Sequence, residues 1–489
     1  MSSVSPNAVN TAERPISYMV LILAVALAWL RGGTHASLTW ITGLLAVAFF
    51  LMLVTGYLPG VRPAGAALRW PWIPLIQLRD PLFGLGLLFL CLLAVQWLNA
   101  GRSLVFEAGT QSWRYSPPPV PGLPFAFSRA EARQMLEWFF PLWVILLALR
   151  APALSTHSVR RIWRGLAYSG GALALFGLVQ FASGATAMYG LVPMRPHFFA
   201  TFGYPNHAGS YFLLVMCLSA GLLSWEISMG QGRRNVARLS LLSAAFLLGL
   251  VGANLALSRL SILASWALVL VLAGVLIRFL WPRLMAVQRL HLVLGSLAVF
   301  SLAILLTLGL GREAIRTEFQ PEKDNKSFMD RETSFRWFQL QSGLRVWRDH
   351  PLFGVGGWGY RYLVATYLPP EQWPRVTEGK ANVHNDPVQF LAEFGLVGVG
   401  LLGLMLLVLA RDLRHRRLAY APLVVLPLVG VALVGGQSLI DLPFRSPAVL
   451  ALWLISLAGA SRVLPPRREP APRPANQLNV SPGGDIVPH

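Results

Sequence analysis

The feature that most constrains the fold of this chain is a series of long apolar stretches. About a dozen stretches of roughly 15–23 residues carry few charges, and a helix needs about 20 such residues to cross the hydrocarbon core of a bilayer. Over the whole chain 13% of residues are charged, against about 25% in a soluble domain. The composition excludes an ordinary soluble enzyme and predicts an all-α polytopic membrane protein.

The apolar stretches between charged or Pro/Gly-rich breaks predict about 12 transmembrane helices. The spans are expected near residues 16–30, 36–58, 81–98, 134–149, 165–183, 205–225, 239–257, 260–277, 290–310, 388–410, 421–441 and 447–462. The remaining segments are a tail at 1–15, a Pro-rich loop at 99–130, a large loop at 311–387 between spans nine and ten, and a Pro/Asn/Gly-rich tail at 464–489 that reads as disordered. Twelve spans place both termini on one side of the membrane.

The distribution of basic residues predicts the orientation. The chain has 41 Lys and Arg against 21 Asp and Glu, and 22 of the basic residues lie on the side of the termini. Because cytoplasmic loops are enriched in Lys and Arg, both termini are expected in the cytoplasm and the large loop outside. The net charge of +20 is then mostly a topology signal, and no nucleic-acid partner is expected.

The large outer loop contains two recognisable patterns. Residues 333–350 can form a helix with Trp337, Leu340, Leu344 and Trp347 on one stripe; it could lie at the membrane interface or, more simply, pack on the bundle. The following segment, Gly354-Val355-Gly356-Gly357-Trp358-Gly359, matches a dinucleotide-binding GxGxxG superficially. That fingerprint needs a βαβ unit, so the pattern is read as a tight glycine turn.

A histidine lies at the end of this loop, where the tenth span begins. In Asn382-Val383-His384-Asn385-Asp386-Pro387, Pro387 suits the first helical position and Asp386 the N-cap. His384 would then lie just outside the helix, where a group with an ordinary pKa of about 6.5 can act as a general base. The alternative is a hydrogen-bonded loop histidine without catalytic function.

Several arginines are expected at the same level. Arg259 interrupts the apolar run between spans seven and eight, Arg195 lies in the loop before span six, and Arg336 lies in the large loop. Arginine side chains suit phosphate oxygens, which suggests a site for a lipid-linked phosphate; snorkelling is the other explanation for Arg259. Asp441 and Arg445, four residues apart, are read as a structural ion pair.

A set of short motifs lies between about residues 195 and 450. The motifs are Thr201-Phe202-Gly203-Tyr204-Pro205-Asn206, Ser258-Arg259, Ser334-Phe335-Arg336, His350-Pro351-Leu352-Phe353-Gly354-Val355-Gly356, His384-Asn385, Glu393-Phe394-Gly395-Leu396-Val397-Gly398 and Ser438-Leu439-Ile440-Asp441. Together these motifs resemble those of the O-antigen ligase and polymerase superfamily of bacterial inner membranes. The resemblance implies a C-type glycosyltransferase-like helical fold with a large periplasmic loop between helices 9 and 10. It also implies transfer of a glycan from undecaprenyl diphosphate to an acceptor hydroxyl, on lipid A-core or similar, with no metal, cofactor or nucleotide sugar.

The resemblance also assigns roles to individual residues. His384 corresponds to the loop histidine proposed to deprotonate or orient the acceptor hydroxyl, and Arg259 to the arginine expected to hold the diphosphate. Arg195 corresponds to an arginine ahead of the Pro-Asn turn and Arg336 to the arginine that opens the loop helix. Both are assigned to diphosphate binding, and a structural role is the alternative for Arg336. The motif residues Asn385, Asn206 and Asp441 are expected to support it.

Three functions remain open at this point. A ligase would deliver a glycan to lipid A-core or another acceptor, whereas a polymerase would join repeat units on the lipid carrier; both would use the same donor and site. A transporter of lipid-linked oligosaccharides is the third, although transporters usually carry polar groups near the bilayer midplane, which these spans lack.

Overall fold

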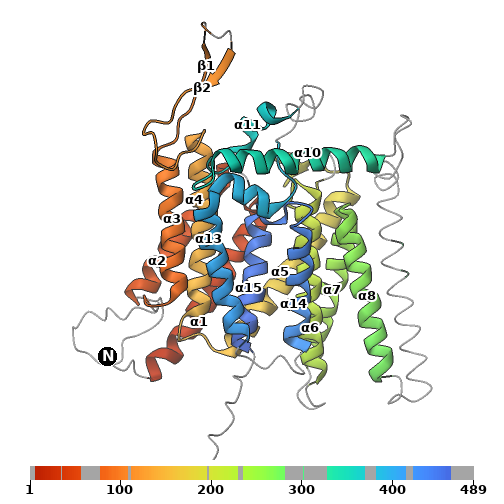
Figure 1. Ribbon diagram of the computed structural model, residues 1–489. Coiled ribbons are helices and arrows are strands. Elements are labelled where there is room, and N and C mark those ends of the chain that lie inside the picture. Colours follow the sequence, from red (N-terminus) through yellow and green to blue (C-terminus); the bar gives the residue numbers. More distant parts are fainter. Residues whose placement is uncertain are drawn as a thin grey trace, which may run out of the picture.

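The computed structural model is a helical bundle (Figure 1). It describes residues 6–34, 36–56, 78–107, 109, 112–194, 198–228, 235–280, 301, 305, 328–368, 381–414 and 422–463. The α-helices in these ranges are α1 (Pro6–Trp29), α2 (Ala36–Thr55), α3 (Pro81–Leu98), α4 (Arg129–Arg150), α5 (Thr156–Ala182), α6 (Pro205–Ser228), α7 (Val236–Leu255), α8 (Arg259–Leu280), α10 (Phe328–Asp349), α11 (Tyr360–Tyr367), α13 (Asp386–Arg414), α14 (Pro422–Gln437) and α15 (Pro447–Val463).

Every expected span except the one at 290–310 overlaps a described helix, although α5 starts nine residues earlier than expected. By length and composition, seven of the described helices could cross a membrane. The described residues also contain three shorter apolar helices of 10–17 residues. The helix α1 starts ten residues earlier than the span expected at 16–30. The span expected at 290–310, apart from residues 301 and 305, lies outside the described residues, as do the segments 1–5, 311–327 and 369–380 and the tail at 464–489, so the expected total of twelve stays a prediction.

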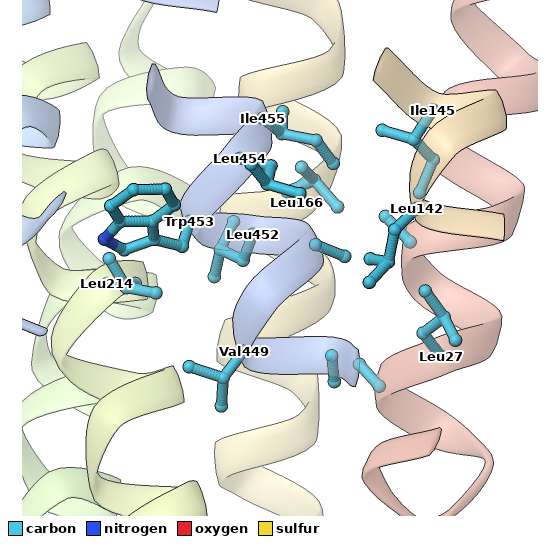
Figure 2. Packing of buried hydrophobic residues seen from close by; sticks show 14 of the residues in the cluster. Leu27, Leu142, Ile145, Leu166, Leu214, Val449, Leu452, Trp453, Leu454 and Ile455 are labelled. Atoms are coloured by element: carbon cyan, nitrogen blue, oxygen red, sulfur yellow. The ribbon is translucent and has the colours of Figure 1, made fainter. Parts of the chain in front are cut away.

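The last helix, α15, lies in the middle of the bundle and packs against α1, α4, α5, α6 and α14. Figure 2 shows Leu452 and Ile455 of α15 among side chains from these neighbours. Lipid tails are as apolar as leucine, so close packing rather than hydrophobicity holds such helices together. A Cβ on Gly459 would lie 2.8 Å from Nε1 of Trp163, so the absence of a side chain there lets α5 approach α15.

One end of the bundle is covered by α10, which runs across it in Figure 1. We call this the α10 end. The first residue of α1 and the last residue of α15 lie at the opposite end. Helix α10 packs mainly through Gln339, Ser342 and Val346, which are buried. The expected apolar stripe forms this contact only in part, since Leu340 packs against the buried cluster that contains Val346, whereas Trp337 is 57% and Leu344 40% exposed.

Helix α13 is interrupted at Gly395, whose φ of 63° and ψ of −169° are not helical. An interruption leaves backbone groups without partners, which is costly inside a membrane. The turn 351–356 supplies partners through four backbone hydrogen bonds, which we call the clasp. They are Val355 N to Ala392 O (3.0 Å), Gly356 N to Glu393 O (2.9 Å), Leu396 N to Pro351 O (2.9 Å) and Val397 N to Leu352 O (3.0 Å).

The predicted glycine turn thus docks into the broken helix. Positive φ angles at Gly354 (64°) and Gly356 (80°) are readily available only to glycine. The Glu393-Phe394-Gly395 motif and the His350–Gly356 motif are therefore two halves of one structure. The clasp fixes residues 351–367, which we call the outer segment, relative to α13, the helix that follows His384.

The Pro-rich loop at 99–130 also contacts this outer segment. It contains an unexpected hairpin of β1 (Leu104–Glu107) and β2 (Ser112–Tyr115), which stands away from the bundle in Figure 1. Asn99 holds the proline-rich part by bonding to Val120 N and O, and a Cβ on Gly356 would lie 2.5 Å from Ala126 Cβ. The loop packs directly on the glycine turn. A second short hairpin, β3 (Ala187–Met188) with β4 (Val192–Pro193), follows α5.

Candidate functional site

Asp441 is the centre of a polar cluster at the α10 end. It lies in the turn after α14, before the 3₁₀ helix η5 (Pro443–Arg445). Its Oδ1 accepts hydrogen bonds from Tyr204 Oη (3.0 Å) and from Leu442 N (2.8 Å), and its Oδ2 accepts one from Asn206 Nδ2. Tyr204 and Asn206 come from the turn that opens α6. The cluster therefore joins two segments that are more than 200 residues apart.

His384 faces this carboxylate, with Nδ1 lying 3.5 Å from Oδ1 of Asp441. The contact is longer than a strong hydrogen bond, as is common for catalytic pairs before substrate binds. The His384 side chain is 26% exposed and that of Asp441 7%. An Nδ1 proton directed at Asp441 leaves Nε2 as the acceptor, so the pair has the composition of an oriented general base.

The charges around Asp441 favour its ionised form. Burial raises the pKa of its carboxyl group, but the neighbouring His384, the charge of Arg336 and the hydrogen bond from Leu442 N outweigh burial and hold the pKa below its usual range. Burial, and then the charge of Asp441, raise the pKa of Tyr204 well above its usual range. Tyr204 therefore stays a hydrogen-bond donor and Asp441 an acceptor near neutral pH.

Asn385 caps α13 and ties it to the turn that carries Asp441. Its Oδ1 accepts a hydrogen bond from Val388 N (2.9 Å), and its Nδ2 donates to Leu439 O (2.6 Å). The expected cap, Asp386, was wrong by one residue. The Asp386 carboxylate instead accepts a hydrogen bond from Phe444 N at 2.9 Å, because the backbone of η5 lies within its reach.

Two of the predicted arginines lie at this end of the bundle. Arg336 of α10 donates from Nη1 to Ile440 O at 3.1 Å, directly beside Asp441. Arg259 is the first residue of α8. Helix α6 packs closely against the residue before Arg259, because a Cβ on Gly209 would lie 2.8 Å from Cβ of Ser258. Gly209 lies three residues after Asn206 of the cluster, so α6 links Arg259 to the cluster. Arg195 lies outside the described residues.

The predicted ion pair between Asp441 and Arg445 is wrong. Arg445 instead pairs with Glu393 of α13, and both side chains are buried, at 3% and 0% exposure. Spacing of i, i+4 brings side chains together only in a helix, and residues 441–445 form a turn with a short 3₁₀ helix. The guanidinium of Arg445 also lies 4.5 Å from the ring centroid of Trp358.

Sequence reasoning missed three participants: Tyr204, Glu393 and Gln389. Tyr204 and Glu393 belong to recognised motifs, but no spacing signal connects them to Asp441 or Arg445. Gln389 lies one turn before Glu393 on α13, and its Nε2 donates to Glu393 Oε1 at 2.6 Å. Within the described ranges, no three His, Cys, Asp or Glu side chains are grouped as metal ligands would be.

An apolar cavity of about 380 Å³ lies beside the cluster. Asp386, Ser438 and Phe444 line it together with residues of α3, α4, α13 and α15, including Met405 and Leu409. Met405 and Leu409 lie about five and about six turns along α13 from Asp386. The cavity therefore runs from the polar cluster into the membrane-spanning part of the bundle.

Residues 244–403 match the family described as O-antigen ligase. The matched range contains Arg259, Arg336, His384 and Asn385, whereas Asn206 and Asp441 lie on either side of it. The match confirms the resemblance that the motifs indicated. No curated protein matches the chain.

Proposed function

We propose that this multi-pass membrane protein, which belongs to the O-antigen ligase superfamily through residues 244–403, transfers a glycan from a lipid diphosphate to an acceptor hydroxyl. The observation that carries the proposal is the pairing of His384 with Asp441 at one end of the bundle. The donor is proposed to be glycan-linked undecaprenyl diphosphate, and the acceptor lipid A-core or a similar glycan. The cavity beside the cluster suits an isoprenoid chain, because it is apolar and leads into the membrane-spanning helices.

The proposed reaction is a single displacement. The acceptor hydroxyl gives its proton to Nε2 of His384 as its oxygen bonds to the anomeric carbon, and the bond from that carbon to the diphosphate breaks. The diphosphate leaves with the bonding electron pair, and arginines stabilise its growing negative charge. Arg259 and Arg336 are the proposed binding groups, with Arg195 as a third. Asp441 keeps the imidazole oriented and offsets its positive charge after proton transfer.

A gel ladder of surface lipopolysaccharide from a deletion strain tests the proposal. The strain is complemented with the wild type, with His384→Ala, or with the control His157→Ala, which changes an exposed histidine at the opposite end of the bundle. We expect the wild type and the control to restore the ladder and His384→Ala to fail at equal membrane abundance. Full complementation by His384→Ala would remove the catalytic assignment.

The same ladder separates a ligase from a polymerase. Bare lipid A-core with polymer retained on the lipid carrier indicates a ligase, which the description of the matched family favours. Core that carries a single repeat unit indicates a polymerase. A purified reaction adds the stereochemistry, because a single displacement inverts the anomeric configuration and a retained configuration would exclude this mechanism.

The arginine roles are tested by binding rather than by activity. Arg259→Ala should weaken binding of a lipid diphosphate at least about tenfold, whereas Arg259→Lys should retain part of it, since lysine keeps the charge but loses the guanidinium geometry. Equal affinity in the wild type and Arg259→Ala would end the phosphate role of this residue.

We further propose that the α10 end faces the periplasm of a bacterial inner membrane and that both termini are cytoplasmic. The basic residues on the side of the termini support this orientation. In a chain with Cys91 and Cys217 replaced by serine, Leu352→Cys should react with an impermeant maleimide in intact spheroplasts. Leu352 is 57% exposed in the turn at the α10 end. Labelling only after lysis would reverse the orientation.

A further inference from the structure

A buried chain of polar contacts connects the backbone beside His384 to the turn beside Asp441. Val383 N donates to Gln389 Oε1 at 2.7 Å, and Gln389 Nε2 donates to Glu393 Oε1 at 2.6 Å. The same Oε1 atom pairs with Nη2 of Arg445. We call Gln389, Glu393 and Arg445 the relay.

Both ends of the relay are next to the candidate catalytic pair. Val383 directly precedes His384, and Arg445 belongs to η5, which follows Asp441 in the same turn. The contact of 3.5 Å between His384 and Asp441 closes the ring. The relay and the direct contact between His384 and Asp441 thus form one closed ring, and the relay is the longer of the two connections between these residues.

The backbone of His384 requires such support. Its φ is 55°, a strained conformation that is uncommon for residues other than glycine. Residues in such conformations persist only where surrounding contacts hold them. The bond from Val383 N to Gln389 and the side-chain cap by Asn385 hold the two residues that flank His384.

Stability alone does not account for a charged relay at this position. Gln389, Glu393 and Arg445 are 1%, 0% and 3% exposed, and well-packed apolar residues often replace a buried ion pair without loss of stability. The relay also contacts the segment after the glycine turn, because the ring centroid of Trp358 lies 4.5 Å from the guanidinium of Arg445 and 4.2 Å from that of Arg361. Arg361 in turn pairs with Glu131 of α4 at 2.8 Å.

We propose that Gln389, Glu393 and Arg445 are positioning residues that set the distance and orientation of His384 relative to Asp441. The catalytic meaning of this inference rests on the proposed function, whereas the geometric statement does not. The relay touches the backbone of Val383, next to His384, and the turn that carries Asp441, and it leaves the reacting groups free for substrate. A change in it should therefore alter the rate of the chemical step more than substrate binding.

The test separates positioning from stability with a double variant. Glu393→Gln alone leaves the charge of Arg445 unpaired in the interior and is expected to destabilise the protein, as is Arg445→Met alone. The double variant Glu393→Gln, Arg445→Met removes both charges and is expected to recover most of the lost thermal stability. Gln389→Leu breaks the relay without changing any charge, and it provides the test if the double variant does not fold.

The first readout is the ¹⁵N spectrum of the His384 ring in lipid nanodiscs, identified by its absence in His384→Ala. The ring shifts report which nitrogen carries the proton and whether Nδ1 is hydrogen-bonded. We expect the folded double variant and Gln389→Leu to show altered His384 shifts, and kcat to fall about 10- to 100-fold with little change in KM. Arg150→Met is the control, because it breaks a partly buried ion pair at the opposite end of the bundle and should lower stability without moving the His384 signal.

A wild-type His384 signal in either folded relay variant would overturn the proposal. The proposed function fails separately: if the wild type transfers no glycan, the ring spectra still decide whether the relay positions His384. If instead the wild type is active and the relay variants keep both the signal and kcat, only the positioning role is lost.

Discussion

Replacement of Gly395 by alanine should disconnect the outer segment from α13. At φ 63° and ψ −169° the backbone occupies a region that is almost exclusive to glycine, and a side chain there costs about 1–3 kcal/mol. The new Cβ would also lie 2.3 Å from the carbonyl oxygen of Leu352. Relief of this overlap requires the clasp to move, and its four backbone hydrogen bonds contribute about 0.5–1.5 kcal/mol each.

Hydrogen exchange measures this effect where it is expected. In Gly395→Ala the amides of Val355, Gly356, Leu396 and Val397 should lose protection by about 2–4 kcal/mol, the sum of a partial loss of the clasp and the backbone strain. Gly400→Ala is the matched control in the same helix, because a Cβ there meets nothing within 4 Å; it should be neutral or stabilise by up to about 1 kcal/mol. Unchanged protection of all four amides in Gly395→Ala would refute the reasoning.

Three further predictions concern the cluster and the core. Because folding lowers the pKa of Asp441 below its ordinary 3.8, its stabilisation is complete above about that pH and disappears as the pH falls through the lowered value; thermal unfolding of Asp441→Asn and the wild type should therefore converge at low pH, and a gap that stays constant contradicts this. Asn385→Ala should cost about 1 kcal/mol through loss of the cap on Val388, seen as faster exchange of that amide alone. Gly459→Val should cost about 1–3 kcal/mol by overpacking against Trp163, with a lower unfolding temperature and an unchanged His384 spectrum.

The spans were predictable because each is encoded locally. An apolar run between charged or proline-rich breaks specifies a helix whatever its neighbours are, so α3 occupies the expected residues 81–98. The interruption of α13 at Gly395 was not predicted, because the residues on both sides continue the apolar pattern. What breaks the helix is the turn 351–356, more than 35 residues earlier in the chain.

The candidate site was predicted residue by residue but not as an arrangement. His384, Arg336 and Asp441 were expected at the same membrane level, and the structure brings them together. The partner of Arg445 could not be found from spacing, since Glu393 lies 52 residues before it. Local rules identify which side chains carry chemistry, whereas their pairing depends on how helices far apart in the sequence pack.

The position of Asp441 near the end of the chain also orders events during synthesis. His384 and the arginines of α8 and α10 are made first, yet the carboxylate that faces His384 follows only after α14. A chain that ends before this point contains His384 but lacks Asp441 and Arg445. The pairing of His384 with Asp441 can therefore form only after synthesis has passed α14.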